Sequence, residues 1–295
     1  MRINHSTTED ETEAVIAIEG LERPLTLMHI TDSHVIAGDK RDPEGLEAGP
    51  RFDAMFRGES PGNTPQQQCF DQALDRSNQL KVDGTVLTGD IIHFPAVAAV
   101  ELLENGLKSL QSPYLYTVGN HDWYFPHLPW NDDTREAYLP RLAHLMGHSP
   151  AAQVMKLGGV RLLALDNSNY QMTDEQLEFL RQQLGTGDPC LLFIHIPLYS
   201  AALGPAVLDK WRAPIMMAAE GWTDETRATW QVGEDDASTG ACHAFLTGEE
   251  AKNLAGVFCG HVHFPHEGEL RPGCVQYVTC QGFSGGYRVI RLKPL

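Results

Sequence analysis

Histidine, aspartate and asparagine residues recur in this sequence directly after short apolar runs. The run 114–117 precedes Val118-Gly119-Asn120-His121-Asp122, so an amide, an imidazole and a carboxylate follow one another in a tight turn. Imidazole and carboxylate donors without thiolate favour Mn, Fe or Zn in a reactive site over a structural zinc cage. The donor groups that follow the other apolar runs are Asp32 and His34, Asp90, His195, and His261 and His263.

The apolar runs that precede these donors alternate with segments of helical spacing. This alternation predicts βαβ units, in which working groups gather beyond the carboxyl ends of the strands. We therefore expect the donors to meet and to bind two metal ions. The expected strands are 14–18, 25–30, 85–88, 114–117, 161–165, 190–194 and 256–259, and the expected helices are 66–80, 96–110, about 173–185 and 249–254.

Asp90 is the candidate bridge between the two ions. A carboxylate has two oxygens, and Asp90 lies in the middle of the set with no neighbouring donor to compete for one metal. Gly89, Gly119 and Gly260 precede donor residues, and glycine permits sharp turns and close backbone approach. His29 falls inside a strand and is expected to be a core histidine rather than a ligand.

Length and charge limit the function. A chain of 295 residues with 42% hydrophobic composition is long enough for one large α/β domain with a buried core. Its formal net charge of −17 argues against a nucleic-acid partner, because phosphate contacts need clustered Lys and Arg. A small anionic substrate stays compatible with this charge, since bound metal ions reverse the local field.

The cysteines and the N-terminus favour a cytoplasmic protein. The six cysteines are scattered without a CxxC motif, so we expect buried thiols. Residues 1–13 lack the basic start and apolar stretch of a signal peptide, and no apolar run approaches the length of a membrane span. We expect no membrane partner, while a homo-oligomer stays possible.

Two segments interrupt the α/β rhythm. The first, about 35–64, is rich in Gly, Pro and charge, and we expect an irregular loop there; its Arg51 and Arg57 are solvated loop charges or reach a substrate phosphate. The second, about 199–247, carries three of the five tryptophans and the acidic run 234–236. We expect both to be insertions in a single domain spanning 1–295, the second lying over the site or at a subunit contact.

Two further segments are an aromatic stretch, for which two roles are considered, and the C-terminal segment. Trp123, Tyr124, Phe125 and Trp130 line a pocket or pack a loop onto the core. The C-terminal segment is expected to form a hairpin around residues 281–285.

Together, the blocks Asp32-x-His34, Gly89-Asp90, Gly119-Asn120-His121-Asp122, a lone His195 and Gly260-His261-x-His263 resemble the calcineurin-like metallophosphoesterases. The blocks occur in that family's order over about residues 25–265. The resemblance implies an α/β/β/α sandwich of four layers with two central mixed sheets, and a binuclear centre of transition-metal ions (Mn, Fe or Zn).

The resemblance also implies a role for each residue. One metal takes Asp32, His34, Asp90 and His263, and the other takes Asp90, Asn120, His195 and His261. His121 faces the substrate, where it stabilises developing charge or protonates the leaving oxygen, and Asp122 orients or charge-stabilises its imidazole. The metals activate a hydroxide for in-line attack on phosphorus.

The chain departs from the protein Ser/Thr phosphatases, which carry Asp-Arg-Gly after the Gly-Asp block. Here Ile91-Ile92-His93 follows Asp90, and His93 contacts substrate or forms a local hydrogen bond. The spacing is similar to the small-molecule branch, which includes cyclic-nucleotide phosphodiesterases. We expect hydrolysis of a small-molecule phosphodiester. A phosphomonoesterase acting on a nucleotide or sugar phosphate, and an inactive scaffold on the same fold, are the alternatives.

Overall fold

The computed structural model describes residues 1–6, 12–147 and 149–295. Residues 7–11, part of the N-terminal stretch considered above, lie outside the described residues. The described chain forms two six-stranded sheets packed face to face. The first sheet has the order β1 (Ile3–Ser6), β2 (Glu13–Ile18), β12 (Arg288–Pro294), β3 (Leu25–Ile30), β4 (Gly84–Thr88) and β5 (Tyr114–Thr117). The second has the order β10 (His266–Arg271), β11 (Cys274–Val278), β9 (Leu254–Cys259), β8 (Cys190–Phe193), β7 (Val160–Leu165) and β6 (Ala152–Leu157).

Both sheets are mixed. β3, β4 and β5 are parallel neighbours, whereas β12 runs antiparallel to β3. β7, β8, β9 and β11 are likewise parallel, with β6 and β10 as antiparallel edges. The parallel strands of each sheet therefore present their carboxyl ends together.

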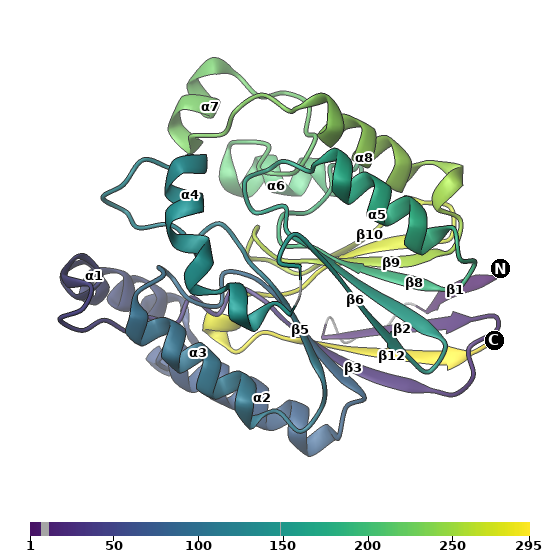
Figure 1. Cartoon of the computed structure of the whole chain (residues 1–295), viewed down its shortest axis with the longest axis horizontal. Coiled ribbons are helices and arrows are strands. Elements are labelled where there is room, and N and C mark those ends of the chain that lie inside the picture. The colour runs from purple at the N-terminus through teal and green to yellow at the C-terminus, as the bar shows by residue number, and fades with distance from the viewer. Residues whose placement is uncertain (7–11, 148) are drawn as a thin grey trace.

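Helices cover the outer face of each sheet (Figure 1). α2 (Gln66–Leu80) and α3 (Val97–Ser109) cover the first sheet, and α5 (Asp174–Leu184) and α8 (Ala237–Thr247) cover the second. The expected capping box begins α5. The Thr173 hydroxyl accepts from the Gln176 backbone amide, and the Gln176 side chain accepts from the Thr173 backbone amide. The expected four-layer α/β/β/α sandwich with two mixed sheets is confirmed.

The remaining helices lie around the end of the sandwich where the parallel strands finish, and both chain termini lie at the opposite end (Figure 1). They are α1 (Pro43–Glu59), α4 (Asp132–Tyr138), α6 (Gly204–Trp211) and α7 (Asp224–Trp230). Short 3₁₀ turns occupy Pro61–Asn63, Leu139–Arg141, Ala143–Leu145, Glu249–Ala251 and Gly282–Ser284.

The core follows the alternation of side chains along the strands. Leu27 and Phe193 point between the sheets, while Met28 and Leu192 point toward the helices. His29 lies between the sheets, with its Nδ1 2.7 Å from the Thr279 hydroxyl and its Nε2 2.8 Å from the Thr88 hydroxyl. The prediction that His29 is a hydrogen-bonded core residue is confirmed.

Three sequence expectations about local structure are wrong. Residues 43–59 form the helix α1 instead of an irregular loop; its buried positions include Gly45, Gly49 and Phe56, and glycines contribute no apolar side chain to reveal the period. The C-terminal hairpin does not form, because β11 and β12 pair in different sheets. The helix expected over 249–254 is reduced to one 3₁₀ turn before β9.

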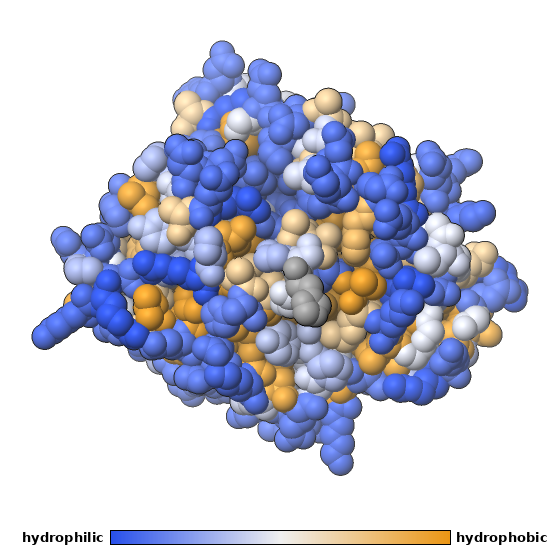
Figure 2. Space-filling view, in the orientation of Figure 1, coloured by the Kyte–Doolittle hydropathy of each residue, from blue (hydrophilic) through white to orange (hydrophobic). Residues whose placement is uncertain are grey.

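Two further expectations concern the cysteines and membrane-spanning segments. The thiols of Cys69, Cys190, Cys242, Cys259 and Cys274 are free and buried, as expected. Among the described residues, no helix has the length and apolar character needed to cross a membrane. The face in Figure 2 is largely hydrophilic, which is consistent with the net charge of −17.

Candidate metal centre

The donor groups predicted from the sequence meet where β3, β4, β5, β8 and β9 end. Each strand delivers its donors in the turn that follows it, so residues more than 200 positions apart in the chain become neighbours. Their possible ligand atoms form three groups, each lying within 4.8 Å. The groups are Asp32, His34 and His263; Asp90, His195 and His261; and His34, His93 and His121.

Many of these donors have a backbone conformation that ordinary residues avoid. A positive φ is uncommon outside glycine and clusters at functional sites, where surrounding contacts hold it. Here the Asp32 amide donates to the Gly89 carbonyl at 3.0 Å, and the His34 amide donates to the Asp90 carbonyl at 2.8 Å. The donors with positive φ are Asp32 (51°), His34 (44°), Asp90 (49°), His261 (70°) and His263 (53°).

Two glycines permit the close approach of these turns. A Cβ on Gly119 would lie 2.2 Å from Asp90 Oδ1, and a Cβ on Gly260 would lie 2.1 Å from Asp32 Oδ2. Such separations are impossible for real atoms, so any side chain at either position would displace a donor carboxylate. The expectation that these glycines serve close approach is confirmed.

The first group has the spacing of a coordination shell. Ligands bound about 2.1 Å from one ion lie about 3 Å from each other. His34 Nε2 is 3.2 Å from His263 Nε2, and His263 Nε2 is 3.3 Å from Asp32 Oδ1. The Asp32 carboxylate is fixed by the His261 amide at 2.9 Å. Asp32, His34 and His263 can therefore hold one ion.

The second group contains an imidazole nitrogen prepared as a ligand. His195 Nδ1 is 2.7 Å from the Thr88 carbonyl, which can only accept, so Nδ1 carries a proton and Nε2 is the nitrogen left for a metal ion. His195 Nε2 is buried and has no hydrogen-bond partner among the described residues. It lies 3.2 Å from Asp90 Oδ2. A buried acceptor is costly to leave unsatisfied, and a metal ion would satisfy it.

Asp90 lies between the two groups. Its Oδ2 is 3.7 Å from His34 Nε2 and 3.2 Å from His195 Nε2, while its Oδ1 accepts from the His121 amide at 2.8 Å. The carboxylate thus faces one histidine of each group, which is the placement expected of a bridge.

Asn120 adds an amide oxygen at the same place. Its Oδ1 is buried without a hydrogen-bond partner within the part of the chain that the structure describes, and Asn120 lines the same cavity as Asp90 and His261. An unsatisfied carbonyl oxygen suits a metal ligand, so the donor chemistry fits a second ion bound by Asp90, Asn120, His195 and His261.

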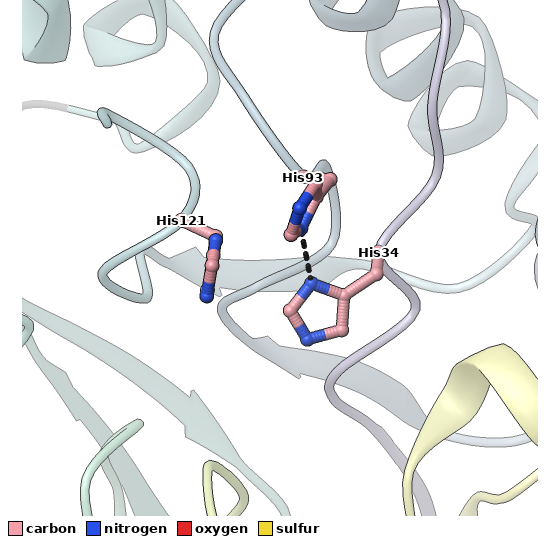
Figure 3. A group of neighbouring side chains, drawn as sticks. All are labelled: His34, His93 and His121. Carbon is pink, nitrogen blue, oxygen red and sulfur yellow. Dashed lines mark hydrogen bonds between the residues drawn. The ribbon is translucent and has the colours of Figure 1, made fainter. Parts of the chain in front are cut away.

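The third group places His93 against two site histidines (Figure 3). His93 Nδ1 is 3.0 Å from His34 Nδ1, which leaves His34 Nε2 directed to the first group. The rings of His93 and His121 stack with centroids 4.5 Å apart. His93 is 2% exposed, forms this local hydrogen bond and also lines the cavity, so both roles considered for it stay predictions.

The carboxylate of Asp122 is held by backbone amides. It accepts from the backbone amides of Gly119 (2.7 Å), Asp90 (2.8 Å) and Ile92 (3.0 Å). Three amide donors converge there because the turns after β4 and β5 lie side by side. Asp122 therefore organises the turn that carries Asp90, and its expected role in orienting or charge-stabilising the His121 imidazole stays a prediction.

Tyr170 is a site residue that sequence reasoning missed. Its hydroxyl is 2.7 Å from His261 Nε2, so the other nitrogen of His261 is the one available to a metal. Tyr170 is 2% exposed and has a φ of 65°, which is a genuine outlier for a bulky residue. No sequence block marks Tyr170, because its contact depends on the loop after β7.

The pKa values of the two carboxyl groups Asp90 and Asp122 are shifted in opposite directions. Burial alone would raise the pKa of Asp90, but His195 and His121 hold it well below its usual range. Burial and the charge of Asp90 raise the pKa of Asp122 to about 7. Burial lowers the pKa of His121, so its ring is neutral at neutral pH and offers one N–H as a donor.

A cavity of about 390 Å³ opens above these groups. Lys210 and Gln231, from the segment 199–247, line it together with Glu59 from α1, so residues of this segment lie over the site. Six rings, which we call the aromatic wall, complete much of the lining: Phe52, Phe56, Tyr124, Trp130, Trp211 and Trp230.

The remaining candidates divide between pocket and core. Tyr124 and Trp130 line the cavity, whereas Trp123 and Phe125 are buried in the core. Arg57 pairs with Asp53 at 2.7 Å. The guanidinium of Arg51 lies 5.6 Å from the ring of Phe52. Neither arginine lines the cavity, so the substrate-phosphate role considered for them is not supported.

Comparison with known proteins agrees with this geometry. Residues 25–265 match the model of a family described as calcineurin-like phosphoesterase. A cAMP/cGMP dual-specificity phosphodiesterase from Mycobacterium tuberculosis is 26% identical over 197 residues, which are 63% of this chain and 54% of that protein. The chain thus spans about half the length of this curated relative.

Solved structures share the fold. A dimetal phosphatase from Danio rerio matches with a TM-score of 0.53 and 12% identity, over 90% of this chain and 91% of that chain. A purple acid phosphatase from yellow lupin (Lupinus luteus) seeds matches with a TM-score of 0.52 and 15% identity, over 92% of this chain and 46% of that chain. At such identities the likeness concerns the sandwich alone.

Proposed function

The chain belongs to the calcineurin-like phosphoesterase family, and we propose that it is a binuclear-metal-dependent phosphohydrolase that cleaves a small-molecule phosphodiester. The observation that carries the proposal is the pair of donor groups joined by the Asp90 carboxylate beneath an aromatic cavity. Two bound transition-metal ions would supply Lewis-acid activation of water and of the phosphoryl oxygens. Mn, Fe and Zn all suit the donor set.

We assign the ligands by group. Asp32, His34 and His263 would hold one ion and His195, Asn120 and His261 would hold the other, with Asp90 shared. Ions held by these residues would place positive charge at the base of the cavity. An anionic phosphate would thereby be attracted into a chain whose overall charge repels it.

His121 is the proposed catalytic residue of the protein itself. Its ring lines the cavity beside His34, with centroids 4.9 Å apart, and its backbone amide is fixed by Asp90. A neutral imidazole N–H there can donate to an oxygen on which charge develops in the transition state. Asp122 and His93 act by positioning, through the Asp90 turn and through His34 respectively.

The preference for a diester rests on the rest of the cavity. Apart from Asp90 and the histidines, Lys210 and Glu59 are the charged groups among the described lining residues, so little cationic charge is available for a second phosphate charge. The name of the Mycobacterium tuberculosis relative supports cAMP and cGMP as the first natural diesters to test.

The test compares two chromogenic esters with the same leaving group. Purified protein with added Mn²⁺ is assayed on bis-p-nitrophenyl phosphate and on p-nitrophenyl phosphate, beside Asp90→Asn and the exposed control Asp209→Asn. We expect faster turnover of the diester, loss of activity in Asp90→Asn and unchanged activity in the control.

Other outcomes select the alternatives. Faster turnover of the monoester would replace the diester proposal with a phosphomonoesterase acting on a nucleotide or sugar phosphate. No activity on either ester, together with protein that retains no metal after loading, would support the inactive scaffold.

A further inference from the structure

Four of the six rings of the aromatic wall come from helices that contain no metal-ligand motif, and the other two follow the Gly119-Asn120-His121-Asp122 block in the loop after β5. Phe52 and Phe56 belong to α1, Trp211 and Trp230 end α6 and α7, and Tyr124 and Trp130 lie in the loop after β5. Three separate stretches of chain therefore converge on one cavity with the same type of side chain. Such convergence indicates a binding surface, since each ring could otherwise pack into its own local core.

On one side the wall rests directly on the metal centre. The ring of Phe56 stacks on His34 with centroids 4.6 Å apart and an angle of 16° between planes. The ring of Phe52 lies 4.4 Å from that of His93. A group bound against these rings would therefore be a neighbour of a phosphate held at the metals.

On the other side the wall is tied to the His261–His263 segment. The Trp211 Nε1–H donates to the Val262 carbonyl at 2.8 Å, and the Trp211 ring meets the His263 ring at 5.6 Å. Trp230 packs edge-on against Trp211, with centroids 5.7 Å apart. These contacts orient both indoles. Trp211 and Trp230 are half-buried, so part of each ring stays accessible.

The ammonium group of Lys210, beside the aromatic wall, already has a hydrogen-bond partner and aromatic neighbours. Lys210 donates to the His263 carbonyl, and its Nζ lies 5.3 Å from the ring centres of Trp211 and Phe264. Its charge is thus directed to the metal side of the cavity. The exposed faces of the wall are left to an uncharged group, because a hydroxyl-rich group would lose water there without replacement hydrogen bonds.

We propose that the aromatic wall binds a planar, uncharged aromatic substituent of the phosphodiester by stacking, while the phosphate reaches the metal centre. The inference rests on the proposed function and narrows its substrate class to diesters with an aryl or heteroaryl group. Stacking of a base on an aromatic side chain strengthens binding by about ten-fold or more.

The test measures equilibrium binding of two diesters with equal charge. Calorimetry on Mn²⁺-loaded protein compares diphenyl phosphate with diethyl phosphate, which share the phosphate group and differ in the substituent. We expect diphenyl phosphate to bind about ten-fold more tightly. Trp230→Ala and, independently, Phe52→Ala should bring this ratio toward one and leave the affinity for diethyl phosphate unchanged.

Phe179→Ala is the matched control, since Phe179 is a half-buried ring on α5 outside the cavity lining. It should keep the ratio of the unaltered protein. Equal affinities for the two diesters, or an unchanged ratio in both wall variants, would overturn the inference. If the protein hydrolyses bis-p-nitrophenyl phosphate but binds the two diesters equally well, only the stacking role of the aromatic wall is overturned. If it binds diphenyl phosphate ten-fold more tightly but hydrolyses no ester, the stacking role is supported and the proposed function is contradicted.

Discussion

The metal centre and the aromatic wall face the same cavity but are built in opposite ways. Asp32 and His195 are fully buried, and most of the donors have a positive φ in the turns that follow central strands. Wall residues such as Trp130 and Trp230 are half-buried and come from loops and peripheral helices. In the proposed enzyme the sheets would fix the chemistry, and the peripheral segments would set the substrate.

This difference predicts two kinds of variant. Changes at the metal centre should remove metal or turnover whatever the substrate, because each donor is held by several neighbours. Changes at wall rings that touch no proposed ligand, such as Phe52 and Trp230, should alter the preference among substrates and leave the chemistry intact. The predictions that follow test this division, beginning with the largest expected effect.

Asp90→Asn should abolish the binuclear centre. An amide keeps one oxygen acceptor and carries no charge, so it cannot bridge two ions as the carboxylate does. We expect fewer than two metal ions per chain by elemental analysis, and a fall in diester turnover of at least about a thousand-fold. Two retained ions with normal turnover would contradict the assignment of Asp90.

His121→Ala should separate turnover from metal binding. The ring faces the cavity and binds no ion in the proposed centre, so both metals should remain while kcat falls by about two to four powers of ten. His127→Ala, at an exposed histidine nearby, is the control. Full activity in His121→Ala would exclude a catalytic role for this ring.

Tyr170→Phe should weaken one metal site selectively. The substitution removes the hydroxyl 2.7 Å from His261 Nε2 and keeps the aromatic ring. We expect about 10- to 100-fold weaker binding for one of the two ions in a Mn²⁺ titration, with the other unchanged. Tyr124→Phe should titrate like the unaltered protein, and identical titrations for Tyr170→Phe would show that the contact is not used.

His29→Gln should alter the pH dependence of folding and leave the site chemistry unchanged. Burial, followed by the charge of Arg288, lowers the pKa of His29 from 6.5 to about 3. Between these values the unfolded chain binds a proton that the folded chain excludes, so stability falls as pH falls through that window. Between pH 6.5 and 5 this amounts to about 2 kcal/mol.

Chemical denaturation at both pH values measures this effect. The His29→Gln variant should lose about 2 kcal/mol less stability on acidification than the unaltered protein, because glutamine takes up no proton. His144→Gln, at a half-exposed imidazole, is the control. An unchanged pH dependence in His29→Gln would mean that His29 is not a neutral core residue.

The sequence predicted which donor residues lie together better than it predicted their surroundings. Strand ends such as 114–117 are marked by apolar runs, and each donor block follows one directly, so local pattern and function coincide. The contact of Tyr170 with His261 joins residues 91 positions apart and leaves no local signal. Asp122 has the motif position of a His121 partner, but three converging amides determine where its carboxylate lies.

The peripheral segments illustrate the opposite case. Helix α1 was hidden because Gly45 and Gly49 occupy its buried face, so hydrophobic periodicity was absent. The sheet that β12 joins is determined by its pairing with β2 and β3, which lie near the other end of the chain. The tryptophans of 199–247 suggested a cover over the site, but their alignment into one wall depends on tertiary contacts. A cytoplasmic location, a single-domain organisation and an oligomeric state stay predictions.

The most direct measurement is a Mn²⁺ titration followed by electron paramagnetic resonance. If Asp90 joins the two donor groups, the protein should bind two ions per chain, and the loaded protein should give the spectrum of a magnetically coupled pair. Asp90→Asn should show at most isolated ions. A single uncoupled Mn²⁺ per chain in the unaltered protein would contradict the binuclear centre.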